Sequence, residues 1–290
     1  MFSKKLVAVF IVILLVIILA IIYVLILRKP ELSLTDKMCG LPNGNVTYYS
    51  EHGIWAGYIV SLQNSTGREI RGITATISVP YAFYNSLAQS EGIAAWLGLG
   101  GFKEANIIQA GITAENFTYY SRYFDWYEEF NASSIHPVAG VVPKENISIS
   151  INLINESKYF WNITIRRGNN NNDFNLDNIS FKIPLKTAEF VSEVSYYEGA
   201  MPSAFSPIKF SNISFTVCNA TLCTKCPFNA MTHLILNIQI HNKTNSSQWV
   251  NITPSIFSNN SFYIYYNGTS KAVPPPQPVV TIGPVITVNH

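Results

Sequence analysis

Two short segments of this 290-residue chain carry polar side chains whose types suit the hydrolysis of an amide bond. Gln109 lies in the segment IIQAG, and Glu189 and Glu193 lie in TAEFVSE. A carboxylate can take a proton from a water molecule and later deliver it to the leaving nitrogen. A neutral side-chain amide can donate a hydrogen bond to the oxyanion of the attacked carbonyl, whatever the pH. Together these residue types indicate a hydrolytic site that needs no histidine.

Both segments have the composition of β-strands, in which every second side chain points to the same face. Glu189 and Glu193 then share a face with Val191, and Gln109 shares one with Gly111. Polar groups on a sheet face are costly inside a closed core. We therefore expect these side chains on the floor of a cleft.

Other catalytic and metal-binding motifs do not occur in the sequence, which has no HExxH, GxSxG, P-loop or dinucleotide-binding glycine motif. The histidines lack the spacing of metal ligands; they are His52, His136, His233, His241 and His290. We therefore expect no cofactor and no metal.

The cysteines allow two interpretations. Cys218, Cys223 and Cys226, with His233 beyond them, have the residue types of a tetrahedral zinc site. In an exported protein these three and Cys39 more simply form disulfides. The sequence favours disulfides and leaves their pairing open.

Six short motifs follow one another along the chain around these segments. They are W-A-G at Trp55, S-V-P at Ser78, W-L-G-L-G-G at Trp96, I-Q-A-G at Ile108, W-Y-E at Trp126 and A-E-F-V-S-E at Ala188. Each motif is weak alone, but the ordered set resembles the glutamic peptidases, or eqolisins, over residues 52–268.

The resemblance implies a β-sandwich of two antiparallel seven-stranded sheets and the activity of an acid endopeptidase. It assigns a catalytic dyad to Gln109 and Glu193; Glu189 takes the place of Glu193 only if the register is shifted. It also implies a substrate cleft that includes Trp55, Trp96, Trp126 and Glu128.

Some positions depart from the pattern of the fungal members. Gly100 and Phe124 stand where those members usually have Asp, and Phe190 stands where they have Trp. Substrate preference and pH optimum therefore do not carry over from the resemblance. We interpret the nearby Asp125 and Glu129 as surface charges.

Short runs of β-branched and aromatic residues, separated by turn residues, predict many strands and no helices in the body of the chain. The expected strands are 58–62, 73–79, 147–153, 160–165, 179–183, 190–194, 213–217, 234–240 and 262–266, and residues 166–175 form a hairpin tip. The pattern is typical of an all-β fold, an antiparallel sandwich or barrel. Together with the resemblance, it leads us to expect an antiparallel β-sandwich of the jelly-roll, concanavalin-like kind, preceded by one transmembrane helix.

Leu6–Leu27 is an unbroken apolar run. As a helix it is about 33 Å long, enough to cross a hydrocarbon core of about 30 Å. A cleaved signal peptide is the alternative, but its apolar region would be shorter. We expect an anchor at 1–29, a stalk at 30–44, the peptidase domain at 45–270 and a Pro-rich extended tail at 271–290.

Glycosylation acceptors of the form N-x-[ST] are far more frequent than chance predicts, and they mark exposed positions of exported chains. The fifteen candidates are Asn45, Asn64, Asn116, Asn131, Asn146, Asn155, Asn162, Asn178, Asn212, Asn219, Asn242, Asn245, Asn251, Asn259 and Asn267. We therefore expect a single-pass membrane protein with a cytoplasmic N-terminus and an extracellular catalytic domain.

The charge balance points away from nucleic acid as a partner, because 19 Lys and Arg face 17 Asp and Glu and the net charge is +2. The expected partners are a polypeptide substrate and the membrane. Two other functions fit the same strands: a non-catalytic domain that binds carbohydrate or peptide, and a structural surface protein.

Overall fold

The computed structural model describes residues 14–15, 17–19, 38–39, 46–49, 53–62, 67–83, 90–102, 104–117, 120–168, 173–183, 185–194, 204–228, 232–241, 249–258, 260–268 and 279–280. Most of the expected anchor, stalk and tail lies outside these residues. Residues 14–15 and 17–19 of the anchor are helical, with exposed apolar side chains. Among the described residues, no helix is long and apolar enough to cross a membrane.

Nine strands form the first sheet, sheet A. In spatial order they are β1 (Val46–Tyr49), β16 (Thr232–Leu236), β2 (Trp55–Ser61), β12 (Thr187–Val194), β5 (Ser90–Gly100), β6 (Ile107–Phe117), β7 (Ser121–Phe130) and β20 (Val279–Val280), and β8 (His136–Gly140) pairs with β7. The central strands β2, β12, β5, β6 and β7 are antiparallel to their neighbours.

Nine strands also form the second sheet, sheet B. In spatial order they are β11 (Phe174–Ser180), β10 (Phe160–Arg167), β9 (Asn146–Asn155), β3 (Glu69–Ser78), β14 (Ile208–Cys218), β19 (Ser261–Gly268), β18 (Trp249–Pro254) and β17 (Ile238–His241), and β15 (Cys223–Pro227) pairs with β14. The short strands β4 (Ala82–Phe83) and β13 (Ala204–Phe205) form a separate pair.

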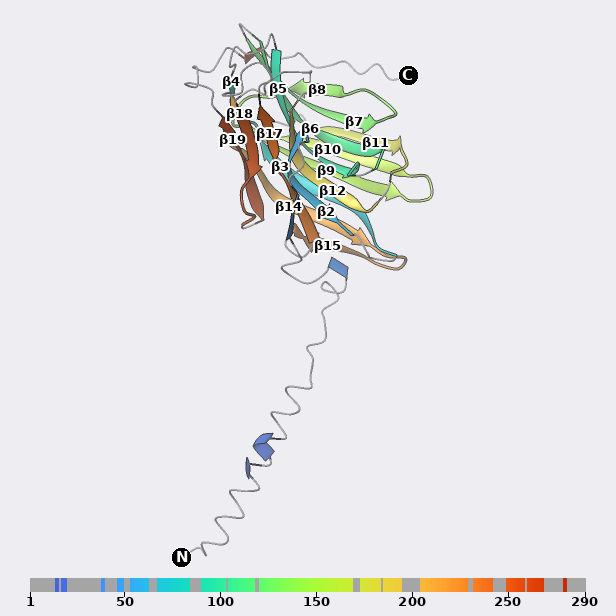
Figure 1. Cartoon of the computed structure of the whole chain (residues 1–290). Coiled ribbons are helices and arrows are strands. Elements are labelled where there is room, and N and C mark those ends of the chain that lie inside the picture. Colours follow the sequence, from blue (N-terminus) through green and yellow to red (C-terminus); the bar gives the residue numbers. More distant parts are fainter. Residues whose placement is uncertain are drawn as a thin grey trace, which may run out of the picture.

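The two sheets pack face to face around one apolar core, as the expected β-sandwich requires (Figure 1). Core side chains alternate along strands of both sheets, for example Ile147, Ile149 and Ile151 on β9 and Ile108, Ala110 and Ile112 on β6. On β9 the intervening side chains are more exposed, whereas β6 and β12 are buried on both faces over most of their length. The side chains on the outer face of β6 and β12 are therefore largely closed to solvent, although several of them are polar.

Five of the nine strands expected from sequence fall within observed strands, and the expected strands 58–62 and 73–79 extend one residue beyond β2 and β3. The expected strand 234–240 spans β16 and β17, which lie in different sheets. Strands β10 and β11 pair as the hairpin expected around 166–175. The expected strand 179–183 is wrong in position, because β11 runs over Phe174–Ser180. The Trp161 indole N–H donates to the Phe181 carbonyl at 2.7 Å, and Ile183 is buried without belonging to a ladder. These apolar residues reach the core from a loop.

Each large sheet has nine strands, whereas the resemblance implied seven. Two of the added strands, β1 and β20, come from opposite ends of the domain and occupy the two edges of sheet A. Both pair in parallel with their neighbours, β16 and β7. A short strand at each edge covers backbone groups that would otherwise be open to pairing with another chain.

An ion pair lies inside the sandwich and connects the two sheets. Arg167 of β10 donates from Nε and Nη2 to the two carboxylate oxygens of Asp125 on β7, at 2.5 and 2.9 Å. The Ala139 N–H donates to the same carboxylate at 2.8 Å. Burial raises the pKa of Asp125, and the guanidinium opposes that rise.

The expectation that Asp125 and Glu129 are surface charges is therefore wrong. Asp125 is fully buried, and the Glu129 side chain is only 13% exposed. Glu129 accepts a hydrogen bond from the Ser133 hydroxyl and lies 3.8 Å from the His136 ring nitrogen. Both carboxyls belong to the interior face of β7, where sequence alternation alone does not reveal their partners.

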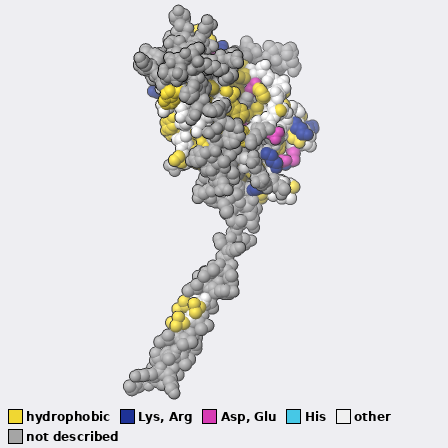
Figure 2. Space-filling model, viewed as in Figure 1, with side chains coloured by type: hydrophobic (Ala, Val, Ile, Leu, Met, Phe, Trp, Pro, Cys, Tyr) yellow, Lys and Arg dark blue, Asp and Glu magenta, His cyan; other side chains and the backbone are white. Residues whose placement is uncertain are grey.

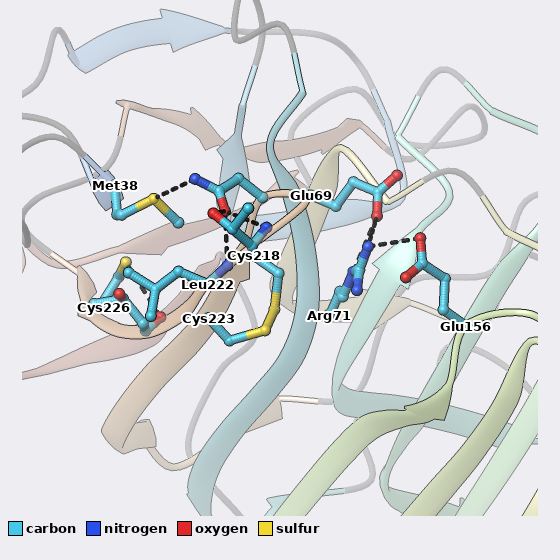
Figure 3. Close-up of a disulfide and its surroundings, with 11 residues drawn as sticks. Met38, Glu69, Arg71, Glu156, Cys218, Leu222, Cys223 and Cys226 are labelled. Carbon is cyan, nitrogen blue, oxygen red and sulfur yellow. Dashed lines mark hydrogen bonds and ion pairs between the residues drawn. A yellow bond between two sulfur atoms is a disulfide. The ribbon is translucent and has the colours of Figure 1, made fainter.

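All four cysteines form disulfides. Cys218 pairs with Cys223 across the β14–β15 hairpin, and Cys39 pairs with Cys226, 187 residues away in sequence. Figure 3 shows Met38 beside this hairpin, where the Asn219 amide approaches its sulfur at 3.4 Å. The Met38 carbonyl also accepts a hydrogen bond from Arg68. The segment around Cys39 is thus held to sheet B by covalent and polar contacts.

Candidate active site

Strand register brings three candidate residues into one row on the outer face of sheet A. Gln109 on β6 lies opposite Glu128 on β7 and opposite Gly98 on β5, and Gly98 lies opposite Glu189 on β12. Cross-strand partners project from the same face of a sheet. The amide and two of the carboxyls therefore share the outer face, as the alternation predicted.

The next row, two residues further along the strands, is aromatic. Trp96 lies opposite Gly111 and Val191, and Gly111 lies opposite Trp126. A Cβ atom at Gly111 would come within 2.5 Å of the Trp96 Cβ and within 2.4 Å of the Ala95 carbonyl oxygen. Glycine at this position therefore leaves room for the Trp96 side chain and the Ala95 carbonyl.

The third row holds Glu193. It lies opposite Trp55 on β2 and Ala94 on β5, and the row continues through Thr113 to Phe124 on β7. Glu193, Trp55 and Ala94 are only partly buried, whereas the first two rows are nearly closed to solvent. Access from solvent to this face is therefore along the Glu193 row.

An apolar cluster separate from the inter-sheet core surrounds these polar groups. Its buried members are Trp96, Ile107, Phe124, Trp126 and Val191, with Trp55 and Ala94 packed against them. The Trp55 and Trp96 rings meet edge to face with centroids 5.0 Å apart. On the side of the molecule shown in Figure 2, charged side chains lie mainly at the right of the domain with a few others apart from them, and most of the visible described surface is hydrophobic or uncharged.

Gln109 is held by Glu128. The Gln109 Nε2 donates to a Glu128 carboxylate oxygen at 2.5 Å, and both side chains are buried. Burial raises the pKa of Glu128; the Gln109 hydrogen bond opposes the rise, and the nearby Glu129 charge adds to it. The Gln109 Oε1 is buried and has no partner among the described residues.

Glu193 is held by a tryptophan. The Trp96 indole N–H donates to a Glu193 carboxylate oxygen at 2.9 Å. Burial raises the pKa of Glu193, the indoles of Trp96 and Trp55 lower it, and the charge on Glu128 raises it. Because Glu128 acts on Glu193 electrostatically and on Gln109 by a hydrogen bond, these three polar groups form one interacting set.

Glu189 is the most deeply buried carboxyl on this face. One of its oxygens accepts a hydrogen bond from the Phe102 backbone N–H at 3.3 Å, and the other has no partner among the described residues. Burial raises its pKa well above the ordinary value. The group is therefore uncharged over a wider pH range than an exposed glutamate.

Unpartnered polar atoms concentrate on this same face. Six buried side-chain polar atoms lack a hydrogen-bond partner in the described part of the chain, and five of them lie here: Trp55 Nε1, Gln109 Oε1, Trp126 Nε1, Thr187 Oγ1 and Glu189 Oε2. Buried polar atoms are nearly always paired in folded proteins. The Trp55 indole and the Thr187 hydroxyl still lie close enough to Glu193 and Glu189 to lower the pKa values of these carboxyls. Gln109 Oε1 and Trp126 Nε1 are therefore the unpartnered atoms of this face that remain open to a polar ligand.

The donor set does not suit a metal, since no group of three or more His, Cys, Asp or Glu among the described residues has the required arrangement. The face instead offers one neutral amide, several buried carboxyls and indole N–H groups. These can activate a water molecule and stabilise an oxyanion without a bound ion.

Three residues of this face were not predicted from sequence as site residues. Ile107, Phe124 and Val191 complete its apolar cluster. The signal was present in the alternation, because Ile107 precedes Gln109 by two residues and Val191 precedes Glu193 by two.

Sheets A and B thus form a β-sandwich whose outer face holds an amide beside buried carboxyls. The family model described as the Peptidase A4 family matches residues 53–266, and the chain belongs to this family. It is accordingly a glutamic endopeptidase, a hydrolase acting on peptide bonds.

Solved structures share this fold. Scytalido-glutamic peptidase in complex with a peptide-based transition state analogue is 18% identical, with a TM-score of 0.53 over 74% of this chain and 98% of that chain. SCP-B, a member of the eqolisin family in complex with the tripeptide Ala-Ile-His, is 18% identical, with a TM-score of 0.52 over the same shares. No curated protein matches the chain in sequence.

Proposed function

We propose that the chain hydrolyses peptide bonds with Glu193 as general base and then general acid, and with Gln109 as oxyanion donor. The observation that supports the proposal is the common outer face of sheet A, where Gln109 and Glu193 lie two rows apart with β5 between their strands, and where both side chains keep unused hydrogen-bonding capacity. Gln109 has a second Nε2 hydrogen beyond the one given to Glu128, and Glu193 receives one hydrogen bond from Trp96. A carboxylate can accept several, so room remains for a water molecule.

The raised pKa of Glu193 suits its two successive tasks. A carboxylate with a raised pKa is a stronger base when ionised, and it holds the accepted proton until the leaving amine takes it. The Trp96 indole stabilises the ionised form, so the group still begins the reaction as a carboxylate.

Glu128 supplies a reason for activity at acid pH. When Glu128 is ionised it accepts a hydrogen bond from the Gln109 amide nitrogen, and it thereby engages part of the oxyanion donor. When Glu128 is protonated it can donate to Gln109 Oε1 once the amide is turned over, which frees both Nε2 hydrogens. The productive state then has Glu193 ionised and Glu128 protonated, so that the two carboxyls together carry one proton.

Glu128→Gln is expected to extend the pH range of cleavage on the alkaline side. The substituted amide can donate to Gln109 Oε1 at any pH, so the loss of activity on the alkaline side is removed. The acid limb should stay in place, because Glu128 is already protonated and uncharged at the pH where Glu193 takes up its proton. The measurement is kcat/KM against pH.

The matched control for this prediction is Glu156→Gln, which removes an exposed carboxylate paired with Arg71 near the edge of sheet B. It should leave both limbs in place. An alkaline limb that stays unchanged in Glu128→Gln would separate Glu128 from the pH dependence.

The proposed location is the outside of the cell, with the domain tethered by Leu6–Leu27. The disulfides support it, because they persist in oxidising compartments. Exposed glycosylation acceptors support it as well: Asn131, Asn146, Asn178, Asn212 and Asn267. Asn116 is fully buried and accepts a hydrogen bond from Ser121, so we leave it out of the proposed glycosylation.

The whole proposal is tested by incubating the folded chain with a denatured protein substrate from about pH 2 to about pH 7, with pepstatin present to suppress aspartic peptidases. Cleavage confined to acid pH is the expected result. A folded chain that cleaves nothing, but whose tryptophan fluorescence responds to peptide or glycan, would support the binding alternative instead.

A further inference from the structure

The nine described strands of sheet A contain a single positively charged side chain of the Lys or Arg type, Arg122 on β7. The same strands contain several carboxylic acids, among them the three on the rows described above. A lone cation on the face of a proposed peptide-binding sheet is a strong determinant of which substrate charges are accepted.

Register places Arg122 on the outer face. It lies opposite Glu115 on β6, and it precedes Phe124 by two residues. Phe124 ends the row that contains Glu193, so Arg122 stands one row beyond it on the side away from Gln109.

The guanidinium is held between aromatic rings. Its central carbon lies 5.3 Å from the Phe124 ring centroid and 5.9 Å from that of Phe117. A planar guanidinium stacked on aromatic rings keeps a fixed orientation. The Arg122 side chain is 40% exposed, so a ligand can reach it from solvent.

Its hydrogen-bonding capacity is only partly used. The Nε and Nη2 atoms both donate to one oxygen of Glu115, and Arg122 has no other partner among the described residues. Because a guanidinium has five N–H donors, the edge that carries Nη1 remains available to a second carboxylate.

The distance from Glu193 fits a substrate side chain. Along the strands Arg122 lies about 7 Å beyond the Glu193 row, and three strand spacings of about 4.8 Å separate β7 from β12. An extended peptide advances about 3.3 Å per residue. The backbone positions of Arg122 and Glu193 are thus separated by the length of about five residues of an extended substrate. The length of the arginine side chain shortens the span that the substrate must cover.

We propose that Arg122 selects substrates that carry a carboxylate about three to five residues from the scissile bond. The inference rests on the proposed function, because it takes Glu193 as the reacting centre. The carboxylate belongs to an Asp or Glu side chain or to the C-terminus of the peptide, and the two sources offer the same bidentate partner to the guanidinium.

The test uses peptides of one sequence that differ only in Glu or Gln at these positions, on either side of the bond, with amidated C-termini. A third peptide has Gln and a free C-terminal carboxylate. Assays are run at about pH 5.5, where a substrate Glu is ionised. The wild type should cleave one Glu peptide about tenfold better, in kcat/KM, than its Gln counterpart.

Arg122→Gln should reduce this ratio to about one, and Arg122→Glu should reverse it in favour of a peptide with Lys at the same position. Arg166→Gln, at an exposed arginine on β10 that pairs with Asp173, is the matched control and should keep the wild-type ratio. If the free C-terminus alone confers the advantage, the carboxylate is terminal. A wild type without preference, or a preference kept by Arg122→Gln, would overturn the inference.

Binding to the Glu193→Gln variant separates this inference from the proposed function. The dissociation constants of the Glu and Gln peptides should differ by the same factor in that variant, and the difference should vanish when Arg122→Gln is added. Absence of all cleavage with this binding preference intact would reject the dyad and retain Arg122. Cleavage without any charge preference would retain the proposed hydrolysis and reject the role of Arg122.

Discussion

Glu193→Gln is expected to lower kcat by about two to four orders of magnitude, because the amide cannot take a proton from water. The substituted amide has nearly the same shape and can still accept the hydrogen bond from Trp96, so the outer face of sheet A should stay packed. Gln109→Ala should lower kcat by about two to three orders of magnitude through loss of an oxyanion donor. Both effects are measured on a peptide substrate at the pH of maximum activity.

Glu189→Gln is the informative control for these variants. Glu189 lies four residues before Glu193 on the same face of β12 and is even more deeply buried, but it bonds the Phe102 backbone rather than Trp96. It should retain most of the activity. Loss of activity in Glu189→Gln with activity kept in Glu193→Gln would move the base to Glu189 and reject the proposed dyad.

Asp125→Asn is expected to destabilise the domain by about 3–5 kcal/mol, because it removes the carboxylate that pairs with the buried Arg167 guanidinium. The pair connects β7 of sheet A to β10 of sheet B, and both side chains are almost fully buried. The free energy of unfolding is measured by denaturant titration with the disulfides intact.

Two further variants distinguish the buried pair from a general effect of charge. Arg166→Met, one residue before Arg167 on β10 but exposed, should change the unfolding free energy by no more than about 0.5 kcal/mol. The double variant Asp125→Leu with Arg167→Met removes both charges and should recover part of the lost stability. Equal stability of Asp125→Asn and the wild type would contradict the structural role given to the pair.

The residues that share the outer face of sheet A were predictable from sequence, because alternation along a strand depends only on neighbouring residues. Alternation alone puts Gln109 with Gly111 and Glu189 with Glu193, and the strand register bears out both pairings. The alignment of these rows across four strands was not predictable, since it depends on β12 inserting between β2 and β5. That insertion joins segments that are far apart in the chain.

The wrong expectation that Asp125 is a surface charge has the same cause, because its partner is distant in the sequence. Asp125 adjoins Trp126 in a motif of the outer face, but its own side chain points the opposite way and meets Arg167, 42 residues later. Nothing local to Asp125 signals that partner. In the same way, the zinc and disulfide interpretations of the cysteines were distinguished only when Cys39 came to lie beside Cys226.

The two added edge strands of sheet A were also missed, because they lie outside the family segment. β1 and β20 lie outside residues 53–266, the part that matches the family, and both attach at the edges of sheet A. A resemblance confined to the family segment therefore predicts the inner strands and misses those contributed by flanking residues.

The Cys39–Cys226 disulfide determines whether a cut in the chain releases the domain. A cut anywhere between Cys39 and β2 would leave both fragments joined through sulfur, so the domain would stay attached to whatever precedes Cys39. Only a cut on the N-terminal side of Cys39 would release a free domain under oxidising conditions. On an electrophoresis gel, the two kinds of cut therefore differ in whether the fragments separate without a reducing agent.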